Sequence, residues 1–111
     1  MACVSLPIGA VTYSNTITTA DASTATQIVP ASGSKSFTLI DIVISTDTEL
    51  TISLQDDSGS PVVIMNGMYF PATSIWSKTW AAGLPVTAGQ DLDVLASGAG
   101  NVSVTVTGYY K

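Results

Sequence analysis

At 111 residues the chain has the length of one domain, and its single cysteine, Cys3, excludes an internal disulfide. It contains no arginine and no histidine, and three lysines stand against eight acids, which gives a net charge of −5. This balance excludes a nucleic-acid-binding protein, which needs clustered cations against phosphates, and the lack of histidine excludes a Ser-His-Asp triad.

The composition also describes an unusual surface. Charged residues make up 10% of the chain, where about 25% is usual, while 46% of the residues are hydrophobic. Serine and threonine, 29 residues together, must supply much of the surface polarity. Because burying such a surface against another protein dehydrates few ions, the composition favours an oligomer or a component of a larger assembly. A monomer with a neutral surface is the alternative.

The first ten residues show no strand or helix periodicity and include Pro7 and Gly9. We therefore expect an N-terminal arm at 1–10 and a single domain at 11–111. The arm lacks the basic and apolar regions of a secretory signal, and no run approaches the roughly 20 apolar residues of a spanning helix. We expect a soluble protein that stays inside the cell where it is made and has no membrane partner.

The next elements are short strands. Residues 11–19, rich in Thr, Tyr and Ile, predict an edge strand, and residues 24–29 predict a strand that stops at Pro30. Residues 35–55 hold the densest cluster of large aliphatic side chains, in two runs joined by a polar corner at 46–48. The second run alternates apolar and polar residues, which predicts a strand with one solvent face.

The first of these two runs is apolar at both parities. Ile40, Ile42 and Ile44 share one parity. The other parity holds Phe37, Leu39 and Val43, interrupted by Asp41. Strict alternation therefore predicts a strand with apolar side chains on both faces.

Turn signals divide the second half of the chain. Residues 56–60 are rich in Asp, Ser and Gly and predict a turn, which Pro61 closes before a further strand. Asn66 and Gly67 form the strongest two-residue hairpin signature in the chain. In the strand at 74–80, Trp76 and Trp80 share one face.

The last third predicts a strand pair that ends the chain. Residues 102, 104 and 106 are valines that alternate with hydroxyl residues, and Gly108 suggests a bulge or a close backbone approach. No segment keeps a 3.6-residue period over three turns. The sequence thus predicts an all-β protein with almost no helix: an antiparallel β-sandwich, jelly-roll-like, of about eight short strands.

The acids offer few candidate sites. Two pairs are close enough in sequence to consider as calcium ligands, Asp56 with Asp57 and Asp47 with Glu49. Both pairs fall at predicted turns, where Asp is expected for backbone reasons alone. Asp91 and Asp93 share a strand face, which we interpret as a solvated face at a sheet edge. We expect no catalytic residue, no metal and no cofactor, and hence no enzyme.

The large side chains that could contact a partner are Met68, Tyr69, Phe70, Trp76 and Trp80. Methionine and aromatic residues are enriched in protein interfaces, and tryptophans also stack on sugar rings. A sandwich of this size needs several large side chains in its core. Core, protein interface and sugar platform therefore all stay open for these five residues.

A resemblance covers residues 36–110. It is carried by turn and strand patterns: Met68 to Pro71, Leu84-Pro85-Val86, Ala88-Gly89 with Leu92, and residues 102–106 followed by Gly108 and Tyr109. In these patterns the chain resembles the capsid decoration, or cement, proteins of tailed bacteriophages, which are β-sandwiches and jelly rolls. It is also similar to jelly-roll modules of phage tails and fibres.

The resemblance implies a viral structural protein made in the host cytoplasm and placed on the capsid exterior. It implies a homotrimer at threefold positions that clamps subunits of the major capsid protein and stabilises the shell. The alternative function is a receptor- or glycan-binding module of a tail fibre. For the trimer seam we predict Phe37, Leu39 and Val43, one face of the doubly apolar strand; the competing interpretation is that a single subunit covers both faces of that strand.

Overall fold

The computed structural model describes residues 8–56 and 63–111, and in these two ranges every regular element is a strand. The eight strands are β1 (Val11–Asp21), β2 (Thr26–Val29), β3 (Phe37–Thr46), β4 (Leu50–Asp56), β5 (Val63–Phe70), β6 (Ser74–Pro85), β7 (Leu92–Ala96) and β8 (Ala99–Tyr110). The predicted all-β sandwich is confirmed. Within the described ranges, no helix is long and apolar enough to cross a membrane.

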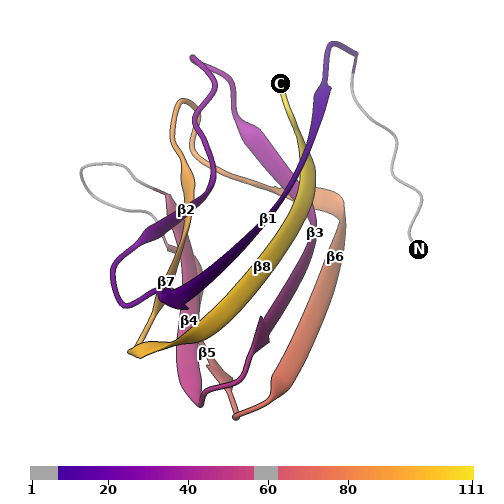
Figure 1. Ribbon diagram of the computed structural model, residues 1–111. Helices are drawn as coiled ribbons and strands as arrows, with labels where there is room; N and C mark the ends of the chain where they lie inside the picture. Colours follow the sequence, from indigo (N-terminus) through magenta and orange to yellow (C-terminus); the bar gives the residue numbers. More distant parts are fainter. Residues whose placement is uncertain (1–7, 57–62) are drawn as a thin grey trace.

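The strands form two antiparallel sheets of four (Figure 1). Sheet A has the order β1-β8-β3-β6 and sheet B the order β2-β7-β4-β5. First and last strands pair, then second and seventh, third and sixth, fourth and fifth, as in one long hairpin rolled up over itself. This order is that of a jelly roll. It leaves β1 and β2 at one side of the sandwich and β5 and β6 at the other.

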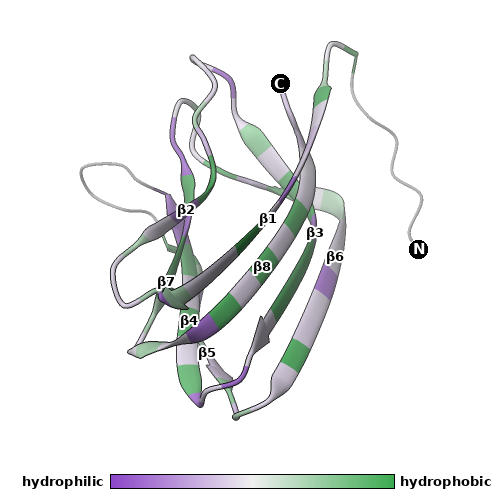
Figure 2. Ribbon diagram, in the orientation of Figure 1, coloured by the Kyte–Doolittle hydropathy of each residue, from purple (hydrophilic) through white to green (hydrophobic). Residues whose placement is uncertain are grey.

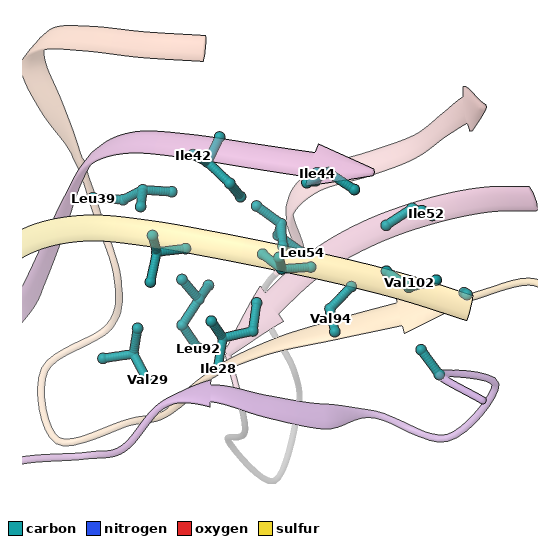
Figure 3. Packing of buried hydrophobic residues seen from close by; sticks show 14 of the residues in the cluster. Ile28, Val29, Leu39, Ile42, Ile44, Ile52, Leu54, Leu92, Val94 and Val102 are labelled. Carbon is teal, nitrogen blue, oxygen red and sulfur yellow. The ribbon is translucent and has the colours of Figure 1, made fainter. Parts of the chain in front are cut away.

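One aliphatic core lies between the two sheets (Figure 3). Sheet A contributes Ile42, Ile44 and the even-numbered valines of β8, and sheet B contributes side chains of β2, β4 and β7, all nearly inaccessible to solvent. The alternation predicted for β4 and β8 is what places these residues inside. A hydrophobic core of this kind supplies most of the favourable free energy of folding.

Strand β3 departs from strict alternation, so Phe37, Leu39 and Val43 do not share one face as predicted. Against β8 the register shifts between Leu39 and Asp41, which leaves Ile40 as an extra residue of β3, a β-bulge. Against β6 the register also shifts here, but there residues 80–83 of β6 are the unmatched ones. The bulge reverses the parity, and odd residues point inward before it while even residues do so after it. Phe37 and Leu39 therefore lie in the core at 1% and 0% exposure, whereas Val43 is exposed.

The predicted hairpin at Asn66-Gly67 is also wrong. Strand β5 runs without interruption from Val63 to Phe70, and the two residues form a bulge where the register against β4 shifts. Gly67 has φ of +57°, a left-handed conformation that both a hairpin turn and a glycine bulge require. The dipeptide signals that conformation and does not distinguish the two structures.

The close approach predicted at Gly108 is confirmed. A Cβ atom there would lie 2.1 Å from the Thr38 carbonyl oxygen and 2.6 Å from Cζ of Phe37. The rings of Tyr13, Phe37 and Tyr110 pack edge to face around this point, with centroids 5.3–6.1 Å apart. The Tyr110 hydroxyl donates to the Pro30 carbonyl at 2.7 Å. Burial also raises the pKa of Tyr110 above its ordinary value of 10.0.

Candidate functional site

The outer face of sheet A is a regular array of hydroxyl groups. In an antiparallel sheet, paired residues point to the same side, so the register sets out three rows across β1, β8, β3 and β6. We call this surface the hydroxyl face. In the strand order β1, β8, β3, β6, its first row is Thr18, Ser103, Ser45 and Ile75, its second row is Thr16, Thr105, Val43 and Ser77, and its third row is Ser14, Thr107, Asp41 and Thr79. Nine of these twelve residues are serine or threonine.

The alternation of β8 explains this face. Its even residues, Val102, Val104 and Val106, are buried, and its odd residues stand on the other side of the strand. Green and pale bands accordingly alternate along β8 (Figure 2). Because β-branched threonine fits a pleated, half-exposed surface, the outer residues favour the strand as well.

Hydrogen bonds run along the rows, from one strand to the next. Thr16 and Thr105 share a bond of 2.9 Å, and Ser14 with Thr107 a longer one of 3.4 Å. The only charged side chain among the twelve is Asp41, and Thr79 donates to its carboxylate. The hydroxyl face is therefore polar and nearly free of charge, so covering it with protein dehydrates one ion.

A groove of about 420 Å³ crosses the end of this face, where the β3–β4 and β5–β6 turns meet it. It is lined by Thr18, Ser45, Thr46, Asp47, Thr73, Ser74, Ile75, Asn101, Val102 and Ser103. The Asn101 amide donates to Asp47 at 2.7 Å and the Thr48 hydroxyl at 2.8 Å. The bond from Asn101, and then that from Thr48, lowers the pKa of Asp47, which keeps the carboxylate ionised.

A second hollow of about 260 Å³ lies on the other side of Ile75, between β5 and β6. Met68, Tyr69, Phe70 and Trp76 line it together with Pro71, Ser74 and Ile75. Ile75 and Tyr69 are the most exposed large hydrophobic side chains of any strand described, at 73% and 61%. Ile75 thus stands between two hollows at the corner of the sandwich.

The five predicted contact residues divide into core and surface. Phe70 is buried and packs edge to face on Trp76, with centroids 6.4 Å apart. Met68, Trp76 and Trp80 are partly buried against the core. Tyr69 alone is exposed, and its hydroxyl donates to Glu49 at 2.8 Å, which raises the pKa of Tyr69. The sequence grouped these residues by type, and their burial separates them.

The three residues of the predicted seam do not form one face. Phe37 and Leu39 are buried in the core of a single copy, so they cannot supply a surface to another subunit, and Val43 lies among the hydroxyl residues. The β-bulge at Ile40 is the physical reason. Ile75 was missed as an exposed apolar residue, although its parity opposite to Trp76 and Trp80 was the available signal.

Two of the acids hold other positions than the sequence suggested. Asp93 is not on a solvated edge: β7 is an inner strand between β2 and β4, and Asp93, paired with Gln27 and Gln55, is buried at 4% exposure. Asp56 is the buried last residue of β4 and accepts a bond from the Thr87 hydroxyl at 2.5 Å. Asp57 and the rest of the predicted turn lie outside the described residues. Residues 8–56 and 63–111 contain no group of three metal-ligating side chains.

Comparisons with known proteins give no family for this chain and a weak structural similarity. No family model matches the chain, and none of the curated proteins does. One solved structure that aligns with it is the cryo-EM structure of the giant freshwater prawn Macrobrachium rosenbergii extra small virus (XSV) VLP. The sequences are 13% identical, and the alignment covers 99% of this chain and 84% of that chain with a TM-score of 0.38. A TM-score below 0.5 carries no functional argument, so the function has to be inferred from the chain's own surfaces.

Proposed function

We propose that this chain is a structural protein of a virus particle, a decoration protein that binds the outside of a tailed-phage head and stabilises the shell. Jelly rolls also build lectins and enzymes, so the fold by itself selects no function. The observation that carries the proposal is the hydroxyl face, a broad sheet surface with a single charge among twelve residues. The resemblance of the sequence to cement proteins points the same way.

The physical argument concerns the cost of dehydration. Ions lose favourable hydration when an interface covers them, whereas hydroxyl groups exchange water for neutral partners at low cost. Neither lysine nor arginine stands on the hydroxyl face, and the carboxylate of Asp41 already accepts a bond from Thr79. A shell surface of similar polarity would bury this face without leaving an unpaired ion.

The proposal includes the homotrimer that the resemblance implies. Three copies that touch several shell subunits bind through many modest contacts, because each further contact forms at high effective concentration. The trimer seam has to lie elsewhere than at Phe37 and Leu39, which belong to the core of one copy. Light scattering of the purified chain tests the number of copies.

Binding to heads tests the function itself. Purified chain is mixed with heads that lack it, sedimented with them and imaged by electron microscopy; we expect added density on the head exterior. Thr105→Lys, in the middle of the hydroxyl face, should lower head occupancy at least about tenfold, because it buries an unpaired ammonium. Ala25→Lys, on the exposed β1–β2 loop, is the matched control and should bind as the unchanged chain does.

Two outcomes would contradict the proposal. Density at the tail with none on the head would favour the receptor-binding alternative, as would specific binding on a glycan array. Equal binding of Thr105→Lys and Ala25→Lys would remove the hydroxyl face from the contact.

A further inference from the structure

The four edge strands of the two sheets differ in how they are protected against pairing with another chain. Exposed edges are usually blunted by short length, proline, charge or bulges. Strand β2 has four residues and stops at Pro30. Strand β5 contains the bulge at Asn66-Gly67. Strand β6 carries Lys78 and ends at Pro85, and its register against β3 breaks at residues 80–83. Three of the four edges are therefore protected.

Strand β1 has none of these devices along most of its length. It is eleven residues long, and residues 11–20 contain no charge and no proline. Its ladder to β8 is regular from Val11 to Thr19, with one irregularity near the end. Within the described ranges β1 pairs with β8 alone. The Asn15 amide donates to the Ile28 carbonyl of β2 at 3.0 Å, so the strand is also fixed in place. A long, regular, uncharged edge is a template for strand pairing.

We propose that the free edge of β1 pairs antiparallel with β1 of a second copy across a twofold axis. The middle residue of the strand is Thr16. Pairing about that residue sets Thr16 opposite Thr16 and Ser14 opposite Thr18, and it joins the two A sheets into one of eight strands. Outer residues then face outer residues, as the pleat requires.

The pairing satisfies the side chains on both sides. Threonine and serine placed opposite each other form cross-strand hydrogen bonds, as Thr16 already does with Thr105 of its own copy. Asp21, the one charge of β1, lies at the end of the strand and would face Val11 of the other copy. No like charges meet. The contact is self-complementary, which a twofold interface demands.

A twofold contact joins copies in pairs, so it is not a contact within a trimer. On a shell it would connect one trimer to its neighbour. The inference goes beyond the proposed function and does not depend on it, because two copies of the chain are all that the pairing requires.

Single-cysteine cross-linking tests the pairing on the protein alone. Cys3→Ser provides the background, and Thr16→Cys puts one thiol at the proposed axis, where opposite Cβ atoms of a strand pair lie about 5 Å apart, near disulfide range. Under mild oxidation we expect a covalent dimer on a non-reducing gel. Ser77→Cys is the control, since it is equally exposed on the hydroxyl face but lies on β6. It should form no covalent dimer.

Failure to cross-link Thr16→Cys, or equal cross-linking of both variants, would overturn the proposal. Thr16→Lys gives a second measurement, because it sets two ammonium groups opposite each other. Sedimentation velocity should show association weakened about fivefold or more relative to the unchanged chain. Unchanged association of Thr16→Lys would also overturn it. Neither experiment contains a phage head, so a failure of shell binding leaves both results interpretable.

Discussion

The two faces of sheet A are built from the same strands and have different tasks. On the inner face Ile44 and Val104 are excluded from solvent, and on the outer face their neighbours Val43 and Thr105 are at least partly exposed. The inner face holds the fold together through buried apolar area, while the outer face keeps its polar groups available for contacts. Adjacent residues of one strand should therefore respond very differently to the same kind of change.

The largest expected effect is on the inner face. Ile44→Ala should lower the free energy of unfolding by about 2–5 kcal/mol, because it removes buried methylene groups and leaves a cavity. Val43→Ala, one residue away on the outer face, should cost less than about 1 kcal/mol. Urea denaturation measures both. Equal losses would mean that the two faces do not differ in burial as the structure has them.

The next largest loss of stability is expected where the inner face has no space for an added methyl group. Gly108→Ala would place its Cβ against the Thr38 carbonyl and the Phe37 ring, and we expect a loss of about 1–3 kcal/mol as the strands shift apart. Gly98→Ala is the matched control, because the nearest atom to its Cβ is Cδ2 of Leu50 at 3.9 Å. Thermal unfolding should rank the variants in this order, and the opposite order would contradict the packing around Gly108.

A smaller effect is expected for Thr105→Val on the outer face. It removes the hydroxyl that pairs with Thr16 but keeps the branched shape, so the free energy of unfolding should change by no more than about 0.5 kcal/mol. The partner hydroxyl stays at the surface, where water replaces the lost bond. A loss as large as that of Ile44→Ala in the same urea titration would show that the outer hydrogen bonds hold the sheet together.

The smallest effect is expected for Asp47, whose carboxylate lines the groove. The bond from Asn101 lowers the pKa of Asp47 in the folded state below its ordinary value of 3.8. The bond therefore stabilises the fold at pH values above 3.8, and this stabilisation is lost as the pH falls through the lowered pKa. Asn101→Ala should raise the pKa of Asp47 toward the ordinary value. Carboxyl chemical shifts followed by NMR between about pH 2 and 6 measure it. An unchanged titration would mean that the bond does not form in solution.

The sequence predicted those parts of the fold in which one strand alone decides the outcome. The alternation of β4 and β8 gave their buried and exposed faces, and Pro30 marked the end of β2. The composition predicted a surface rich in hydroxyl groups. These are local properties, since side-chain direction alternates along any strand without reference to its neighbours.

The tertiary structure decided whatever depends on neighbouring strands. Ile40 is a bulged residue only relative to β8, and it reversed the face assigned to Phe37 and Leu39. Asp93 is away from the sheet edge because β7 lies between two strands, which alternation cannot reveal. Which strands lie at the edges of the described sheets, and hence where we propose that a second copy pairs, likewise follows from strand order. The physical reason is that a strand's pattern fixes its own two faces, whereas its register and the covering of its edges are fixed by the strands beside it.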